Sequence, residues 1–424
     1  MAIAKRFLTT FILTSLFVIP EAQGQDFHLK LDEAEIVAFG DSIDGKRHGK
    51  WLFNNQYKRK IADGFYTHGV QDSIWTRYMN GRIREIVRLR KGKRHGTYTN
   101  YDSNGAIISE ANYKEDQLNG LYREYYDSGP VALEGHYIKG EKDSTWTEYS
   151  PFKIANYIKR YSLGKAHGTW EFFHSTGRLN RKENYYYGLE NGEWTEYYKN
   201  KVLGRRYYYK NGLLDSLYQE FFDNGFLSVE GKYAFGLKIG TWLSMTLNGA
   251  LFSIGDYDKG VKTGLWKYFH ENGSLESEGK FKSDLRTGQW IYYYQSGKLQ
   301  SIGSYLHGEK MDLWGHFYEN EQVIQDENWK NGRLMEVGDY YTIQGEKRSK
   351  GNLSSGNGIR NTYYPTGELK SVEKYVDGYA HGLWVNYHIN GKRESQGHYV
   401  KNEKAGMWLY FNRKGKEVGN RNFD

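Results

Sequence analysis

Aromatic side chains return along this chain with a nearly constant period. Counted from Trp170 in steps of 24, one position is aromatic every time: Tyr122, Trp146, Trp194, Tyr218, Trp242, Trp266, Trp290 and Trp314. Steps of 22 to 24 extend the series to Trp51, Trp75 and Tyr98 upstream, and to Gly338, Arg360, Trp384 and Trp408 downstream. We call this position the slot. Sixteen slots lie between about residue 46 and residue 424.

Other residues keep the same phase. Glycine lies two residues before the slot at Gly49, Gly96, Gly120, Gly168, Gly192, Gly240, Gly264, Gly288, Gly358, Gly382 and Gly406, and serine at Ser73, Ser144 and Ser216. A second aromatic follows three residues after the slot, as at Tyr125 and Phe269, and a third fifteen residues after it, as at Tyr137 and Tyr257. Several offsets in phase over sixteen copies indicate a true internal repeat.

Turn signals divide each repeat into two arms. Asn-Gly pairs lie six and seven residues after the slot, as at Asn248-Gly249 and Asn272-Gly273. Such pairs suit the hairpin turn in which both central residues have positive φ. A second glycine-centred turn follows near offset eighteen, as at Lys259-Gly260. Two turns in 24 residues predict strands of about eight residues in an antiparallel meander.

Turns of two or four residues fix which residues face each other. Across the first turn Trp266 should face Gly279, and Gly264 should face Phe281. Across the second turn Gly279 should face Trp290, and Phe281 should face Gly288. Large rings would then cover strand glycines in both directions. The aromatic at offset three has opposite parity, so we expect it on the other face unless a bulge intervenes.

These patterns predict an all-β fold, an elongated single-layer antiparallel β-hairpin meander of about 16 repeats. Composition agrees, because 38% of residues are hydrophobic and 17% are aromatic, so rings must supply much of the burial. Stability would come from contacts between neighbouring repeats, as in other solenoids. The 50 glycines and 4 prolines suit strands joined by glycine turns.

The N-terminus has the pattern of a secretory signal. Lys5 and Arg6 precede an apolar run, Phe7 to Ile19, which Pro20 ends. This run is too short to span a bilayer, and a small-residue site predicts cleavage after Gly24. We therefore expect a signal peptide (1–24), an N-terminal linker or edge cap (25–45) and a repeat array (46–424). The mature protein would be secreted or periplasmic, with no transmembrane span after cleavage.

Net charge and cysteine content exclude several kinds of site and partner. The chain has no cysteine, which excludes disulfides, catalytic thiols and thiolate metal sites. Its formal charge of +8 is mild for 424 residues. Together with secretion, that makes nucleic acid an improbable partner.

Three segments carry a family resemblance. "KGKRHGTYTNYDSNG" (91–105), "YDKGVKTGLWKYFHENG" (257–273) and "YVDGYAHGLWVNYHING" (375–391) resemble the MORN repeat, in the bacterial variant form often labelled toxin–antitoxin antitoxin. The resemblance covers roughly residues 46–424, with degenerate repeats at Gly338 and Arg360. It implies a hairpin meander that associates with proteins or membrane surfaces, without catalysis and without a cofactor. The antitoxin label implies, as a third alternative, an inhibitor of a partner protein.

Two residue sets are candidates for site chemistry. His48, His95, His167 and His381 share the position three before the slot, but Asn, Asp or Thr replaces them in sister repeats. A metal site needs fixed ligands that converge, so a role in turns is the stronger interpretation. Glu124, Glu148 and Glu196 also recur. Glycosidase chemistry needs two carboxylates about 5 to 10 Å apart in a cleft, and a solvated strand face explains these three better.

Two surfaces are candidates for binding. Trp242, Trp266, Trp290 and Trp314 would lie about 9.6 Å apart, where ring faces could stack on the sugars of a glycan. The alternative is that these rings pack over their glycines and hold the sheet together. A basic segment carries Arg82, Arg84, Arg88, Arg90, Lys91, Lys93 and Arg94 against Glu85 alone. It could hold an anionic envelope surface or an acidic partner, and a solvated hairpin is its alternative.

The leading functional hypothesis is a non-enzymatic scaffold that binds an unidentified protein partner. The second hypothesis is a binder of cell-envelope glycans or anionic surfaces that uses the tryptophans and the basic segment.

Overall fold

A computed structural model describes residues 36–423 of the chain. Contacts divide the chain into an N-terminal part, Met1–Gly177, and a C-terminal part, Arg178–Asp424. The predicted signal peptide and residues 25–35 of the predicted linker lie outside the described residues. Residues 36–423 include no helix that is long and apolar enough to cross a membrane.

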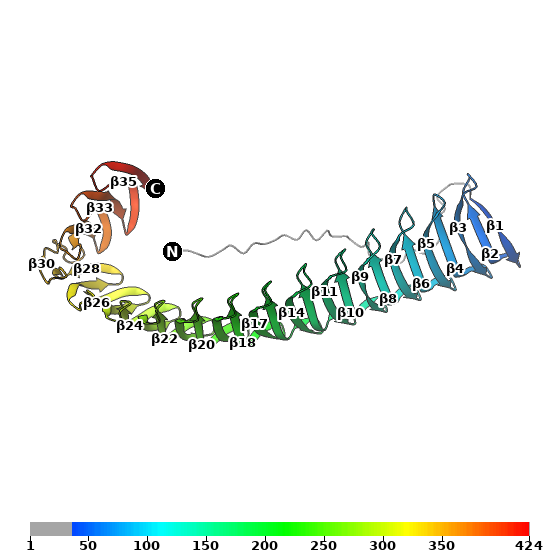
Figure 1. Cartoon of the computed structure of the whole chain (residues 1–424), viewed down its shortest axis with the longest axis horizontal. Helices are drawn as coiled ribbons and strands as arrows, with labels where there is room; N and C mark the ends of the chain where they lie inside the picture. Colours follow the sequence, from blue (N-terminus) through cyan, green and yellow to red (C-terminus); the bar gives the residue numbers. More distant parts are fainter. Residues whose placement is uncertain (1–35, 424) are drawn as a thin grey trace. The chain divides into compact units, whose positions relative to one another are not determined.

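The N-terminal part is a run of antiparallel strands in which each strand from β1 to β10 pairs with the next along the chain, and β11 pairs with both β12 and β13 (Figure 1). Its strands are β1 (Val37–Ile43), β2 (Lys46–Asn54), β3 (Lys60–Thr67), β4 (Val70–Met79), β5 (Arg82–Arg90), β6 (Lys93–Tyr101), β7 (Ile107–Lys114), β8 (Gln117–Tyr125), β9 (Val131–Ile138), β10 (Glu141–Tyr149), β11 (Ala155–Ser162), β12 (Lys165–Ala166) and β13 (Gly168–Phe173). Strand β1 falls within the segment predicted as a linker or edge cap, and it pairs with β2.

The C-terminal part begins with an antiparallel meander. Its strands are β14 (Leu179–Tyr186), β15 (Leu189–Glu190), β16 (Gly192–Tyr197), β17 (Leu203–Lys210), β18 (Leu213–Phe221), β19 (Leu227–Ala234), β20 (Leu237–Met245), β21 (Leu251–Asp258), β22 (Val261–Phe269), β23 (Leu275–Lys282), β24 (Leu285–Tyr293), β25 (Leu299–Leu306), β26 (Glu309–Phe317), β27 (Val323–Lys330) and β28 (Arg333–Val337).

The same part ends in two smaller sheets. The two-stranded sheet holds β29 (Tyr340–Tyr341) and β30 (Lys347–Arg348). The six-stranded sheet holds β31 (Gly358–Tyr363), β32 (Leu369–Val376), β33 (Tyr379–Tyr387), β34 (Arg393–Val400), β35 (Glu403–Phe411) and β36 (Glu417–Phe423). The regular meander breaks between β28 and β31, where the sequence repeats are degenerate. The predicted all-β antiparallel hairpin meander is confirmed.

Cross-strand register confirms three of the four predicted pairs. Trp266 faces Gly279, Gly264 faces Phe281, and Gly279 faces Trp290. The fourth pair is wrong, because Phe281 faces Arg286 rather than Gly288. The register shifts directly after Gly279, so two residues of β24 have no partner on β23. The strand is bulged at that point, which sequence parity alone does not reveal.

The bulge explains the glycine two residues before the slot. All eleven glycines at this position have positive φ, from +60° at Gly240 to +126° at Gly358. The serines there share the conformation, with φ of 61° at Ser73, 58° at Ser144 and 65° at Ser216. Glycine adopts this left-handed backbone without steric cost, whereas other residues are strained.

The bulge also frees a backbone carbonyl, which the indole of the slot tryptophan satisfies. The Trp290 Nε1–H donates to the Lys280 carbonyl at 3.1 Å, and Lys280 lies where the register shifts. Trp242, Trp266 and Trp314 make the same bond to the residue ten positions earlier, at 3.1 to 3.2 Å. Glycine and tryptophan therefore recur together. Glycine adopts the left-handed backbone of the bulge, and the tryptophan indole donates to the carbonyl that the bulge leaves without a backbone partner.

The turn with positive φ at both central residues is the second turn of the repeat rather than the first. In the second turn, Lys259 and Gly260 have φ of 48° and 90°, so both central residues are left-handed. In the first turn only Gly273 is left-handed, because Asn272 belongs to a longer loop. There the Asn272 side chain accepts from the Ser274 N–H and donates to the Gln295 carbonyl of the next repeat. The expectation that both residues of the Asn-Gly pair have positive φ was wrong for this reason.

Substitution at the bulge tests this account. We expect Gly264→Ala to lower the free energy of unfolding by about 1 kcal/mol, because Gly264 has φ of +64°, whereas an added Cβ would meet only the Asp256 carboxylate at an ordinary contact distance of 3.8 Å. Gly264→Asn should cost less, since asparagine tolerates this conformation. Thermal unfolding of both variants checks the order. An alanine variant as stable as the parent would contradict the bulge as the reason for glycine.

Candidate interaction surfaces

The slot tryptophans define one face of each sheet, which we call the front face. Trp242, Trp266, Trp290 and Trp314 are only 0 to 4% exposed. Each indole covers the glycine eleven residues earlier, where an added Cβ would overlap the ring. This is the arrangement expected if the rings pack over their glycines and hold the sheet together. It leaves a sugar no open ring face to stack on at these four positions.

Burial of a slot tryptophan follows the glycine beneath it, except in the first repeat, where Trp51 lies over Gly40 and is half-buried. Trp75, Trp146, Trp242, Trp266, Trp290, Trp314 and Trp408 are buried, and each lies over glycine. Trp170, Trp194 and Trp384 are half-buried, and the residue eleven positions earlier is Lys159, Glu183 or Glu373. A side chain at this position thus prevents the indole from lying flat on the strand.

A cation covers the outer side of many slot tryptophans. Lys238, Lys262 and Lys310 place their Nζ 4.0 to 4.3 Å from the ring centroid of the tryptophan four residues later. Arg286 lies 4.7 Å from Trp290 in the same way. Arg47, Lys142 and Lys404 repeat the contact at other slots. Sequence reasoning missed this position, although a basic residue four before the tryptophan was a readable signal.

On the opposite face, which we call the back face, basic and acidic side chains form ion pairs across neighbouring strands. Lys267 pairs with Glu278 at 3.4 Å, and Arg123 pairs with Glu134 at 3.2 Å. The aromatics at offset three lie on this face, as predicted: Tyr125, Tyr149 and Tyr293 donate to Glu110, Glu134 and Glu278. Cross-strand ion pairs on a solvated face each contribute little.

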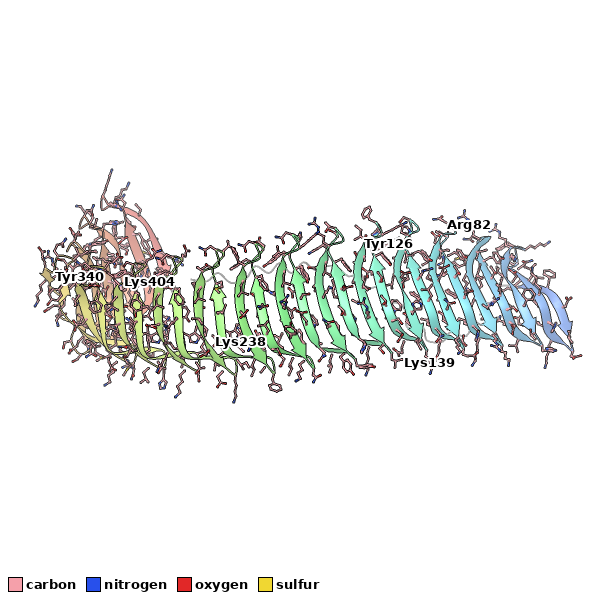
Figure 2. All side chains as sticks on the ribbon, turned by 60° about the horizontal axis from the view of Figure 1, so that its bottom comes forward. Arg82, Tyr126, Lys139, Lys238, Tyr340 and Lys404 are labelled. Atoms are coloured by element: carbon pink, nitrogen blue, oxygen red, sulfur yellow. The ribbon has the colours of Figure 1, made fainter. Side chains whose placement is uncertain are left out.

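The predicted basic segment spans β5 and β6 of the N-terminal part. Arg82, Arg88, Arg90, Lys91 and Lys93 are exposed, whereas Arg84 and Arg94 are half-buried. Arg82 and Arg84 donate to the Ser103 and Tyr101 carbonyls. Arg94 binds Asp116 and covers the Tyr113 ring at 4.2 Å. In Figure 2, Arg82 and Tyr126 lie along one long edge of this part and Lys139 on the opposite edge. Some basic side chains of this segment are thus exposed to solvent, and others contact residues within the sheet.

The histidines three residues before the slot contact turns. His48 Nδ1 accepts from the His68 N–H at 3.5 Å, and Asn119, Asp143 and Asn191 accept from the equivalent turn of the next repeat. His95 lies 3.3 Å from Glu115. Residues 36–423 contain no group of three or more His, Cys, Asp or Glu arranged to hold a metal ion.

The recurrent glutamates bond to neighbouring side chains rather than to one another. Tyr122 donates to Glu124 at 2.6 Å, Tyr207 to Glu196 at 2.7 Å, and Asn156 to Glu148 at 3.0 Å. These contacts place the three acids in separate strand-to-strand bonds.

Phenols on the front face should make the fold sensitive to alkali. Burial first, and then the Glu124 charge, raises the pKa of Tyr137 to about 12. A pKa raised on folding stabilises the fold fully below the ordinary tyrosine value near 10, and this stability is lost as pH rises through the folded pKa. We expect phenolate absorbance to lag behind free tyrosine and then rise together with unfolding. Parallel ultraviolet and circular dichroism titrations test this. Ordinary titration of every tyrosine in the folded state would contradict it.

Comparison with known families agrees with this geometry. Residues 94–115, 166–185, 262–283 and 286–307 match the MORN repeat variant family. These are MORN repeats. The matched segments come from both parts of the chain, and each carries the slot with its bulge glycine. The MORN resemblance predicted from sequence is confirmed.

Solved structures add little to this assignment. The chain is 10% identical to a chain of the TcdB2–TccC3 crystal structure, over 85% of this chain and 27% of that one, with a TM-score of 0.15. For the Photorhabdus luminescens Tc holotoxin pore the identity is 10%, over 89% and 24%, with a TM-score of 0.14. This chain thus spans about a quarter of those chains. No curated protein sequence matches it.

Proposed function

We propose that this MORN repeat protein is a non-enzymatic scaffold, secreted or periplasmic, that binds a protein partner along its repeats. The observation that carries the proposal is the single-layer sheet, which presents the same chemistry at each repeat. Extended repeat surfaces of this kind suit long binding partners. The back face also exposes one apolar side chain just before several slots: Leu265, Leu313, Leu383 and Met407 are 45 to 62% exposed.

Capture from cell-envelope extract tests the proposal. The full chain, immobilised by a tag, should recover a protein partner that saturates with increasing extract. Cross-linking mass spectrometry in the native envelope would then identify the partner and the contacting repeats together. Failure to recover any saturable protein partner by both methods would refute the scaffold role.

A second candidate function is binding of an envelope glycan or anionic surface. The observation that favours it is the exposed cluster of Arg88, Arg90, Lys91 and Lys93 on one hairpin. A glycan array and anionic vesicles, each probed with the parent and with Arg88→Gln/Arg90→Gln, test this function. Equal binding by both proteins, or none by the parent, argues against the basic cluster.

A further inference from the structure

Three cations on the front face of the C-terminal part lack acidic partners. Lys238, Lys262 and Arg286 lie on β20, β22 and β24, each half-buried against an indole. Within residues 36–423, no carboxylate lies at ion-pair distance from any of the three. Lys262 and Arg286 instead donate to phenols, at 3.0 Å to Tyr268 and 3.2 Å to Tyr292 and Tyr305. Lys238 lies beside the second-turn edge of its sheet (Figure 2).

The neighbouring repeats do carry front-face acids, which bound this cationic stripe on both sides. Two residues after the slot, Glu220 accepts from Tyr218, whereas the next three repeats have Ser244, Tyr268 and Tyr292 there. At the other end Lys310 pairs with the buried Glu327 at 3.6 Å. The stripe of Lys238, Lys262 and Arg286 is therefore a short stretch of positive side chains without ion pairs of their own; the nearby Asp284 carboxylate accepts from the Lys262 backbone N–H at 2.7 Å.

The charge in the stripe is also poorly hydrated. Burial lowers the pKa of Lys238; the Glu220 charge raises it in part, and repulsion from Lys262 is a smaller contribution that lowers it. An indole occupies one side of each cation, so only the outer side is open to water or an anion. A carboxylate that approaches from solvent would relieve the repulsion without displacing the indole.

The spacing of the stripe selects the shape of an anionic partner. Successive cations lie two strands apart, which is about 9.6 Å at ordinary strand spacing. A polyproline II chain rises about 9.3 Å in three residues and returns each third side chain to the same side. An α-helix needs about 10.5 Å for seven residues, and an extended strand alternates its side chains between two sides. The polyproline II repeat fits the stripe best.

We propose that the stripe of Lys238, Lys262 and Arg286 binds an acidic segment of a partner protein, in polyproline II conformation, with a carboxylate at every third residue. The proposal rests on the scaffold function and names the partner chemistry of one surface. Buried tryptophan faces argue for a peptide over a sugar chain here, because stacking on a glycan would need open rings. Phenol hydroxyls between the cations can accept or donate hydrogen bonds to the peptide backbone.

Peptides that differ only in spacing test the proposal. Fluorescence anisotropy with the full chain would compare three consecutive Glu-Pro-Pro triplets with a peptide of equal composition whose three glutamates are adjacent. We expect the spaced peptide to bind about tenfold more tightly at low ionic strength, because it engages three cations at once. Added salt should weaken both complexes. Equal affinity for the two peptides would overturn the spacing argument.

Matched variants separate the stripe from general positive charge. Lys238→Gln/Lys262→Gln/Arg286→Gln should lose the tenfold preference. Lys232→Gln/Lys267→Gln/Lys280→Gln removes the same charge from the same repeats outside the stripe and should keep it. Lys238→Arg/Lys262→Arg/Arg286→Lys guards against misfolding, because it retains both the charge and the cover on each indole. Retained preference in the first variant, or loss in the second or third, overturns the assignment to the stripe.

Other occupants are distinct outcomes of the same experiment. Binding of an oligogalacturonate or of phosphatidylglycerol vesicles, lost in the first variant while neither peptide binds, would overturn the peptide assignment. A protein captured from envelope extract equally by parent and first variant would sustain the scaffold function and overturn this inference. The two proposals can therefore fail independently.

Discussion

Gly279→Ala is expected to destabilise the repeats around β23 and β24 by about 1–3 kcal/mol, the usual cost of overpacking a filled site. A Cβ at Gly279 would overlap Cδ2 of Trp290, whose side chain is 0% exposed. The Trp290 ring also meets the Phe281 ring edge at 5.2 Å and stacks with Tyr292, so it cannot move without disturbing both neighbours. Partial loss of that burial also forfeits part of the roughly 1.5–3 kcal/mol that burial of a large apolar side chain contributes.

Hydrogen exchange is the measurement that resolves this effect, since a repeat array opens locally and need not unfold in one step. Amides of β23 and β24 should exchange faster in the variant, with a red shift of tryptophan emission. Gly419→Ala is the matched control, because Gly419 lies on β36 with no heavy atom within 4 Å of an added Cβ. Similar exchange in parent and Gly279→Ala would refute the contact between ring and glycine as a source of stability.

The sequence pattern predicted the fold wherever a single offset determines a single contact. Trp266 and Gly279 sit at complementary positions in every regular repeat, so their pairing follows from the period alone. The error at Phe281 and Gly288 arose where two residues of β24 bulge out of the ladder. A residue with positive φ is visible in the sequence only as a recurrent glycine, and glycine can recur at a position for several other reasons.

Candidate surfaces were less predictable than strands, because periodicity does not say which side of a ring is covered. The tryptophan ladder was visible in the sequence, but its burial follows from the glycine beneath and the cation above. Lys262 and Arg286 were readable as periodic basic residues. Their lack of acidic partners depends on cross-strand neighbours, and these become known only with the register.

The junction near Arg360 was beyond sequence reasoning for a different reason. Arg360 occupies a slot, and Glu327 stands where regular repeats have the glycine. Arg360 donates to Glu327 at 2.6 Å and to Gln325 at 2.8 Å, across more than thirty residues of irregular chain. This contact joins β31 to β27 after the regular meander ends, so no repeat offset predicts it. Leu334, Val337, Leu353, Tyr375 and Ala380 form the apolar cluster of the same junction.

Arg360→Met should be the most destabilising single change in the C-terminal part, at about 3–5 kcal/mol, because it removes the nearest cation from a buried carboxylate. Glu327 is 5% exposed, and its other contacts are the Trp329 indole at 2.8 Å, His316 at 3.1 Å and Lys310 at 3.6 Å. The double variant Arg360→Met/Glu327→Gln removes both charges and should recover much of the loss. Hydrogen exchange at β27 and β31 measures each step. A double variant no more stable than the single one would contradict a charge-based cost.

Acid should weaken the same junction in the parent protein. Burial alone would raise the pKa of Glu327, but the His316 hydrogen bond and the Arg360 charge outweigh it, and the pKa falls well below the ordinary range. A carboxyl whose pKa is lowered by folding stabilises the fold fully above its unfolded pKa, near 4.3, and loses that contribution as pH falls further. Protection of the β27 and β31 amides, relative to unstructured amides at the same pH, should therefore fall below about pH 4 in the parent. It should do so less in Arg360→Met/Glu327→Gln, where no carboxylate remains at this position to protonate; an equal acid response in both proteins would place the sensitivity elsewhere.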